Sequence, residues 1–243
     1  MSRSGVTSNT EHSRRTGRSA RTERSPRPNR SSSTDQAPRR SARQAERRAR
    51  TRARLLKAAG KVFARHGYER ATLDEIAEEA GLSKGAVYYN FASKEELFLA
   101  LLEDRLVGQF EGVERTFRQA AAPQRQSEQA AQLFLQGLER DSRWAPLFFE
   151  FVAYCARDPA RRAHFAERFL HTARRLLSGV IERRYDELEL DPPMKPDELA
   201  ICIDALTNGM VIERLFAPGS VPDDLLGRAV ALLTRPLEAG PRA

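Results

Sequence analysis

Apolar residues recur at helical spacing through most of the chain after residue 45. The first clear stripe falls at i, i+4, i+7, i+8 and i+11 and predicts a helix over 47–66, which Gly67 ends. Further stripes predict helices over 72–80, 83–90, 93–120, 127–141, 146–157, 159–185, 196–216 and 222–234. No segment alternates apolar and polar residues as a half-buried strand does. The sequence therefore predicts an all-α fold.

Two short helices are expected on either side of a glycine turn in residues 72–91. Thr72 with Glu75 forms the pattern of a capping box, and Ser83 is a cap for the next helix. Gly81 lies between the two helices, where a glycine permits the turn of a helix-turn-helix. A further capping pattern, Ser93 with Glu96, begins the longest of the early helices. We expect a helix-turn-helix over residues 72–91.

The outward face of the second short helix has the chemistry of a DNA-contacting surface. It carries one cation, two phenols, an amide, a hydroxyl and a glycine but no acid, from Ser83, Lys84, Gly85, Tyr88, Tyr89 and Asn90. Lysine and tyrosine donate hydrogen bonds to phosphate oxygens, and glycine permits close backbone approach. The acids of the preceding helix are expected to lie away from DNA. The alternative interpretation is an ordinary helical hairpin with a solvated face.

Charge is concentrated at the N-terminus. Residues 1–50 hold fourteen arginines and four acidic residues, whereas the remainder is nearly neutral. Residues 1–43 contain almost no large apolar side chains, so we expect disorder there. The predicted organisation is a tail over 1–44, a DNA-binding domain over 45–109 and a helical domain over 110–243. The tail is either a solubilising segment or an arm that adds salt-sensitive affinity for DNA phosphates.

Several classes of protein are disfavoured by composition. The longest apolar runs span six residues, 97–102 and 151–156, far below the ~20 that a membrane helix needs. There is no secretory signal pattern, and Cys155 and Cys202 have no metal or disulfide spacing. We therefore expect a cytoplasmic protein without a membrane partner, metal or other cofactor. Both cysteines are interpreted as small buried apolar residues.

One motif suggests a competing enzymatic function. Residues 81–85, Gly-Leu-Ser-Lys-Gly, match the G-x-S-x-G pattern of the nucleophile elbow of serine hydrolases. That pattern requires a strand before the serine, whereas a capped amphipathic helix is predicted there. His164 and His171 would be candidate bases, although no acid is placed with them. We predict that Ser83 is a helix cap and that the protein is not an enzyme.

The same region resembles the DNA-binding domain of the TetR/AcrR family of transcriptional regulators. The resemblance covers about 60 residues, 49–109, and rests on the spacing of Gly67-Tyr68, Thr72, Ile76-Ala77, Gly81, Ser83-Lys84-Gly85, Tyr88, Phe91 and Ser93-Lys94-Glu95. It implies a three-helix DNA-binding domain followed by about six helices that bind an inducer and form a homodimer. A palindromic double-stranded DNA operator is the implied partner.

The resemblance also implies roles for individual residues. Phosphate contacts are implied for Thr72, Tyr88, Tyr89 and Lys94, and base contacts for Lys84 and Gly85, while Ala86 offers at most a contact to a thymine methyl group. Asn90 departs from the family, which usually has histidine at this position. An amide still donates to phosphate, but that contact is less well supported.

Aromatic residues of the C-terminal half are candidates for an inducer pocket. The segment 144–155 is apolar on nearly every side, as a buried or cavity-lining helix is. The candidate lining residues are Phe117, Phe134, Trp144, Phe148, Phe151, Tyr154, Phe165, Phe169 and Met210, each of which would otherwise be plain core. Glu150 interrupts the apolar segment and either reaches solvent or, if buried, favours a cationic or hydrogen-bond-donating ligand.

The resemblance to the TetR/AcrR family further implies that the last two predicted helices form the dimer. Their apolar faces consist of Leu199, Ile203, Leu206, Met210 and Leu215, and of Leu225, Leu226, Ala229, Leu232 and Leu233. We therefore interpret the protein as a homodimeric repressor released by an unidentified small-molecule inducer. The alternatives are an activator or inducer-independent regulator on the same fold, an RNA- or nucleoid-binding protein driven by the arginine tail, and a serine hydrolase.

Overall fold

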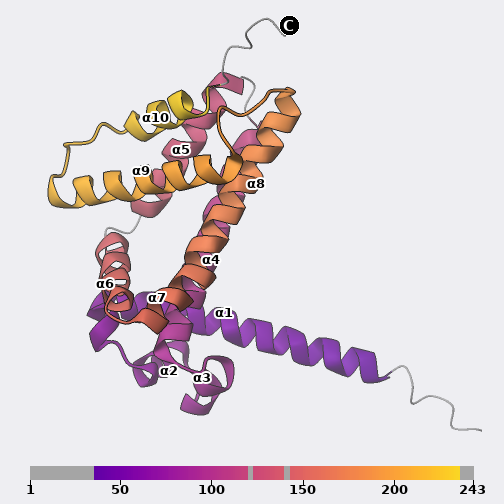
Figure 1. The fold of residues 1–243 in the computed structure, drawn as a ribbon. Helices are drawn as coiled ribbons and strands as arrows, with labels where there is room; N and C mark the ends of the chain where they lie inside the picture. The colour runs from indigo at the N-terminus through magenta and orange to yellow at the C-terminus, as the bar shows by residue number, and fades with distance from the viewer. Residues whose placement is uncertain (1–35, 120–122, 140–142, 236–243) are drawn as a thin grey trace, which may run out of the picture. The chain divides into compact units, whose positions relative to one another are not determined.

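The computed structural model describes residues 36–119, 123–139 and 143–235, and every regular element in these ranges is helical (Figure 1). The chain separates into two units, residues 1–44 and 45–243, and all contacts below lie within the second. The elements are α1 (Gln36–Arg70), α2 (Leu73–Ala80), α3 (Lys84–Asn90), α4 (Lys94–Gln119), α5 (Pro123–Glu139), α6 (Trp144–Ala156), α7 (Pro159–Phe165), a π-helical turn η1 (Ala166–Leu170), α8 (His171–Leu188), α9 (Pro196–Phe216) and α10 (Leu225–Leu233). The predicted all-α fold is confirmed.

Several element boundaries differ from the prediction. Helix α1 begins at Gln36, inside the segment predicted to be disordered, because residues 36–46 are mainly alanine, arginine and glutamine, which favour helix. Pro38 is tolerated there because it lies in the first turn, where backbone N–H groups lack helical partners. Helix α5 begins at Pro123 rather than at 127. The rest of the predicted disordered tail, residues 1–35, lies outside the described residues.

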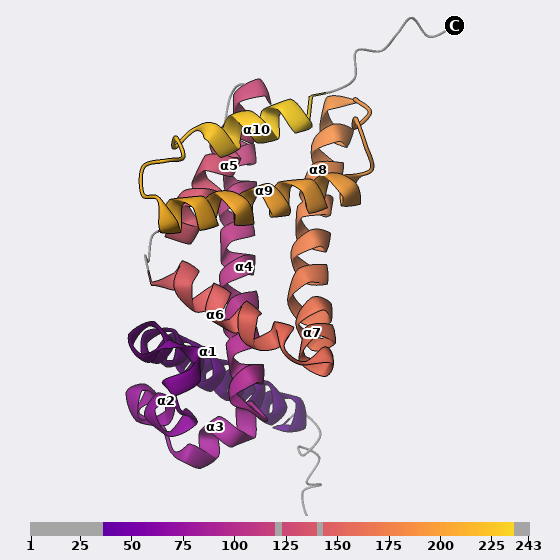
Figure 2. The same cartoon turned by 60° about the vertical axis from the view of Figure 1, so that its left-hand side comes forward.

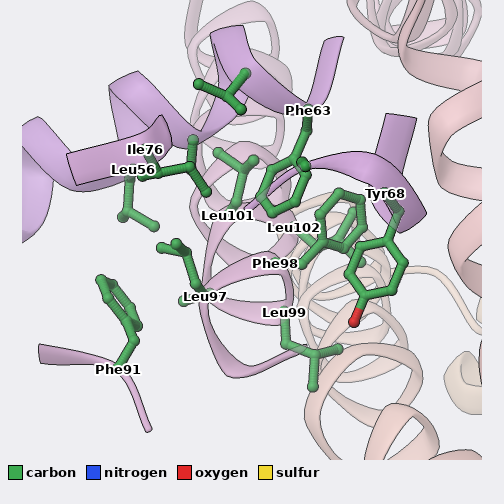
Figure 3. Packing of buried hydrophobic residues seen from close by; sticks show 14 of the residues in the cluster. Leu56, Phe63, Tyr68, Ile76, Phe91, Leu97, Phe98, Leu99, Leu101 and Leu102 are labelled. Atoms are coloured by element: carbon green, nitrogen blue, oxygen red, sulfur yellow. The ribbon is translucent and has the colours of Figure 1, made fainter. Parts of the chain in front are cut away.

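The first four helices share a compact apolar core (Figure 3). Leu55, Phe63 and Ile76 from α1 and α2 are completely buried, as are Val87 of α3 and Leu97 of α4. These positions are the helical stripes read from the sequence, and burying them orients α2 and α3 as a pair. Burial of a large apolar side chain contributes about 1.5–3 kcal/mol, so this core holds the short helices that are too short to be stable alone.

Helix α4 continues from the N-terminal half of the protein into the C-terminal half, where it runs beside α8 (Figure 2). Arg168 of η1 joins the two by donating from Nε and Nη2 to both carboxylate oxygens of Glu103 in α4, at 2.7 and 3.0 Å. Helix α9 packs across α8, and the Ser178 hydroxyl donates to Asp197 Oδ1 at 2.8 Å between them. Helix α10 covers α5. Helices α4, α5, α8, α9 and α10 together enclose the C-terminal core.

Glu150 of α6 joins the two halves of the protein. Gly67 interrupts α1 with φ 76° and ψ 175°, a backbone conformation that residues with a side chain rarely adopt. The interruption exposes the amides of Tyr68 and Glu69, which donate to the Glu150 carboxylate at 3.1 and 2.9 Å. Glu150 is half-buried, and its carboxylate caps a backbone turn, a role that neither expectation for Glu150 included and that a sequence pattern cannot reveal.

Lys94 lies on the carbonyl side of the same turn. Its ammonium donates to the carbonyl oxygens of Tyr68 and Glu69, both at 2.8 Å, and lies 4.7 Å from the centre of the Tyr68 ring. Partial burial lowers the pKa of Lys94, while the nearby Glu150 carboxylate opposes that shift. The Tyr68 ring packs edge-on against Phe98 and Phe151, with ring centres 5.2 and 4.8 Å away. The turn is thus fixed by opposite charges and by aromatic packing.

We predict that Gly67→Ala destabilises the protein. A Cβ at this position would lie 2.9 Å from Glu150 Oε2, and the positive φ adds strain of about 1–3 kcal/mol. Gly108→Ala is the matched control, because Gly108 is an exposed site within α4 with no atom within 4 Å of the added Cβ. At Gly108 we expect the substitution to raise the free energy of unfolding by about 0.5–1 kcal/mol. Urea denaturation followed by circular dichroism measures both; equal effects would contradict the prediction.

Candidate nucleic-acid interface

The helix-turn-helix is fixed by three local interactions. The Thr72 hydroxyl accepts the amide of Glu75, whose carboxylate accepts the amide of Thr72, so the predicted capping box is present. Gly81 ends α2 with φ 61°, in the left-handed region. Arg54 of α1 donates to the carbonyl of Ala80 at 2.7 Å and so ties α1 to the turn. The predicted helix ends are therefore confirmed by their capping geometry.

Helix α3 turns one face to the core and another to solvent. Val87 is completely buried, whereas the side chains of Tyr88 and Tyr89 are 59% and 68% exposed. Ser83 caps the helix by accepting the amide of Ala86, and the surface of Gly85 is open enough for close backbone approach. Ala86 and Asn90 are half-buried, and the Asn90 amide donates to the Ala86 carbonyl at 2.7 Å. The outward residues thus form one continuous polar surface.

Lys84 has an acidic neighbour that the sequence interpretation placed elsewhere. Its ammonium donates to Asp74 Oδ2 of α2 at 2.5 Å, and both side chains are exposed. This contact raises the pKa of Lys84 above its usual value. The expectation that the acids of α2 lie away from the DNA-facing surface is therefore wrong for Asp74. The α2–α3 turn brings residues ten positions apart into contact, which spacing on a single helix does not predict.

Arginines of α1, which were not among the predicted DNA contacts, extend this surface. The Arg48 guanidinium lies 5.3 Å from the centre of the Tyr89 ring, and that of Arg52 lies 5.2 Å from the Phe91 ring. Both arginine side chains are exposed. Their spacing of four residues places them on one face of α1, which is the signal that was available in the sequence. They add positive charge beside the phenols of α3.

Two further predicted DNA contacts have internal partners. Thr72 is exposed, but its hydroxyl also donates to Glu75 Oε2 at 2.9 Å. Lys94 uses two donors on the carbonyls of Tyr68 and Glu69, which leaves one donor for another acceptor. The structure thus assigns both residues a role in fixing helix ends, and their contacts with phosphate stay predictions.

The surroundings of Ser83 differ from those of a hydrolase nucleophile. The element before it is helix α2 rather than a strand, and its hydroxyl accepts a backbone amide as a cap. The candidate bases have other partners: His164 lies 3.3 Å from Glu95, and His171 lies 3.0 Å from Glu167. The G-x-S-x-G match is therefore explained by capping of α3.

The aromatic residues predicted to line one pocket are divided among several places. A cavity of about 530 Å³ in the C-terminal half is lined by Phe117 and Phe134, and Phe134 also borders an adjoining cavity of about 60 Å³. The smaller cavity is lined as well by Trp144, Phe148 and Phe169. The remaining candidates, Phe151, Tyr154, Phe165 and Met210, line neither cavity. They belong to or pack against the buried clusters between helices instead.

In the described ranges, no helix is both long and apolar enough to cross a membrane. The same ranges contain no cluster of three side chains suited to hold a metal ion. The thiol of Cys155 is buried, which raises its pKa to about 11, and Cys202 is half-buried; neither forms a disulfide.

Two family models match the chain. Residues 55–101 match the model for bacterial regulatory proteins of the tetR family. Residues 123–239 match the model for the C-terminal domain of BetI-type transcriptional repressors. The first match includes the turn between α2 and α3 and all of α3. The second covers α5 to α10, which include all the helices around the larger cavity except α4, so the two models fall on the two halves that Glu150 joins.

Individual relatives agree with the family models. The chain is 38% identical over 99 residues to the transcriptional activator FasR of Mycolicibacterium smegmatis, a match over 41% of this chain and 45% of FasR. It is 28% identical to the HTH-type regulator YfiR of Bacillus subtilis, over 70% of this chain and 83% of YfiR. The fold is similar to a TetR-family regulator from Mesorhizobium loti (TM-score 0.60, 21% identity, 77% and 95% of the two chains). It is also similar to Bacillus subtilis FadR in complex with stearoyl-CoA (0.57, 18%, 76% and 98%). This chain belongs to the TetR family of transcriptional regulators.

Proposed function

We propose that the protein is a homodimeric repressor that binds a palindromic DNA operator and is released from it by a small molecule. The observation that carries the DNA-binding part is the outward face of α3, where Lys84, Gly85, Tyr88 and Tyr89 are exposed together and no acid lies on α3 itself. A major groove admits a helix of this size, and its walls are phosphates. Arg48 and Arg52 extend the positive surface beside it.

The proposed contacts divide into two kinds. Lys84 and Gly85 stand at the first turn of α3 and approach base edges, as the first residues of a recognition helix do. The phenols of Tyr88 and Tyr89, with Arg48 of α1, donate to phosphates on either side. The Asp74 contact with Lys84 is exposed, so DNA phosphates compete for the same ammonium. Asn90 has a reduced part in this proposal because its amide is engaged with Ala86.

The dimer is proposed to form through a face of α9 different from the one expected. Leu199 is completely buried, and Ile203, Leu206 and Met210 pack inward, so that stripe belongs to the core. The opposite face carries Ile201, Ala205, Gly209, Ile212 and Phe216, all exposed. Leu232 of α10 is also 73% exposed. Exposed apolar side chains at helical spacing, with small residues between them, suit a two-fold helix–helix interface.

The C-terminal half supports the proposal that the protein represses rather than activates transcription. Residues 123–239 match a model of BetI-type repressors, and the AcnR repressor of Corynebacterium glutamicum is 44% identical over 54 residues. The second candidate is an activator, because FasR is named as one. Activation and repression differ in operator position and not in the recognition helix, so the DNA-binding proposal is common to both.

The test is selection of bound genomic fragments with the purified full-length protein, followed by anisotropy titrations on the selected site. We expect one palindromic site whose half-sites lie about one helical turn of DNA apart, ~34 Å. Lys84→Ala should weaken binding tenfold or more, as loss of one good base or phosphate contact does. Arg183→Ala is the control, since Arg183 is an exposed arginine of α8. Binding without sequence preference would contradict the proposal.

We predict that Asp74→Asn tightens operator binding by several-fold. The substitution frees the Lys84 ammonium and removes a negative charge beside the phosphates. Glu78→Gln removes one charge from the same helix at an exposed position and is the matched control. We expect a smaller gain there, because Glu78 forms no contact with Lys84. Anisotropy at two salt concentrations measures both, and equal gains would mean that the Lys84 contact is irrelevant.

We predict that Phe216→Glu produces monomers. The Phe216 side chain is 82% exposed, so a charge there costs little within one subunit but is buried and unpaired in the dimer. Val107→Glu, on α4 at a 44% exposed position, is the control. Sedimentation velocity measures the oligomeric state. The Phe216 variant should also lose operator affinity, and a dimeric Phe216 variant would refute the proposed interface.

A further inference from the structure

The larger cavity is lined almost entirely by hydrocarbon. Helices α4, α5, α8, α9 and α10 surround its volume of about 530 Å³, which lies within the usual range of about 300–1,000 Å³ for small-molecule sites. Leu106, Phe110, Val113, Leu177 and Val180 are among its walls. A ligand that fills this space must therefore present a large apolar body.

The few polar residues at the cavity differ in whether their hydrogen bonds are satisfied. Thr207 donates to the carbonyl of Ile203 at 2.8 Å. Burial raises the pKa of Asp204, while the charge of Arg174 and a hydrogen bond with the Asn208 side chain oppose the shift. The Tyr185 hydroxyl donates to the carbonyl of Thr234. Each of these groups thus has a partner within the protein.

Arg184, near the end of α8, differs from these groups. Its side chain is only 15% exposed and lies over the Phe117 ring, with 5.7 Å from Cζ to the ring centre. Nη1 lies 3.3 Å from Glu187 Oε2, but Nε and Nη2 are buried and have no acceptor within the described part of the chain. A buried donor without an acceptor destabilises the folded protein, and the penalty is larger for the charged donors of a guanidinium.

The unused edge of Arg184 has a defined preference. Nε and Nη2 together form the side of the guanidinium that grips a carboxylate with two parallel hydrogen bonds. Arg168 of the same chain shows this geometry, because its Nε and Nη2 bind the two oxygens of Glu103. At Arg184 the same pair of donors faces no protein carboxylate. Both atoms have almost no accessible surface in the unliganded protein. A ligand oxyanion would therefore complete this edge after the Arg184 side chain turns toward the cavity that it lines.

We propose that the cavity binds an amphiphile with a long apolar chain and a terminal acyl oxyanion or carbonyl group, which Arg184 holds through Nε and Nη2. A cationic head group would be repelled by the positive charge of Arg184 and could not accept hydrogen bonds from Nε and Nη2, so it is disfavoured. A purely apolar ligand would leave both donors unsatisfied. Free carboxylic acids and acyl thioesters share the required chemistry. This inference specifies the small molecule of the proposed function and rests on that function for its regulatory meaning.

Calorimetry on the full-length protein without DNA tests the head group. The probes are dodecanoate, dodecanol and dodecylammonium, used below their aggregation concentrations, and dodecanoyl-CoA to separate free acid from thioester. We expect dodecanoate or the thioester to bind at least tenfold more tightly than dodecanol, and dodecylammonium to bind most weakly. Equal affinity for all head groups, or preference for the ammonium, would overturn the proposal.

Variants of Arg184 test the position of the head group. Arg184→Met retains the length and apolar stem of the side chain and should reduce the affinity for the acyl probe to that for dodecanol. Arg184→Lys keeps the charge but not the paired donors. Its affinity for the acyl probe should therefore lie between that of the unmodified protein and that of Arg184→Met. Arg183→Met is the control, because the exposed Arg183 contacts Glu114 and is outside the cavity lining. If Arg184→Met has a normal thermal transition and binds the acyl probe with unchanged affinity, the proposal is overturned.

Operator titrations with the same probes separate this inference from the proposed function. If the acyl probe binds through Arg184 without releasing DNA, the assignment of the ligand stands and the proposed release fails. If the probe does not bind but the operator is recognised, the assignment of the ligand fails and the DNA-binding function stands. Leu177→Trp, which fills the cavity, should weaken all chain-length-matched probes together, and undiminished binding would place the ligand elsewhere.

Discussion

The carboxylate of Glu150 is the contact on which the relation between the two halves depends. It accepts the two amides that Gly67 exposes in α1, while Lys94 of α4 donates to the carbonyls of the same two residues. One short turn is therefore held by α6 on its amide side and by α4 on its carbonyl side. Hydrogen bonds to charged groups contribute about 1.5–3 kcal/mol each, more than neutral ones, so the turn is held firmly.

Helix α6 connects this turn with the cavities of the C-terminal half. Trp144 and Phe148 of α6 border the smaller cavity, which shares Leu106, Phe134 and Asp204 with the larger one. Glu150 lies within two turns of these residues on the same helix. The same helix therefore borders a cavity through Trp144 and Phe148 and contacts α1 through Glu150.

Much of the DNA-binding half was predictable because its determinants are local. Capping residues such as Thr72 and Ser83, the turn at Gly81 and the stripes of buried apolar residues act within a few positions of one another. The pairing of Lys84 with Asp74 and the placement of Arg48 beside Tyr89 were not predictable, since they depend on how helices pack. The sequence likewise identified α9 but not its exposed face. Leu199 and Ile201 are both apolar, and only packing against α8 decides which is buried.

The π-helical turn η1 between α7 and α8 determines which way α8 faces. A π turn holds one more residue than an α turn, which shifts all following side chains by about 100° around the helix axis. His164 and His171, seven positions apart, consequently do not act as neighbours on one stripe: the first reaches Glu95 on α4, and the second pairs within its own helix. The same angular offset sets the direction around the helix axis in which Val180 and Arg184 point. One inserted residue thus decides which side chains of α8 form the wall of the cavity.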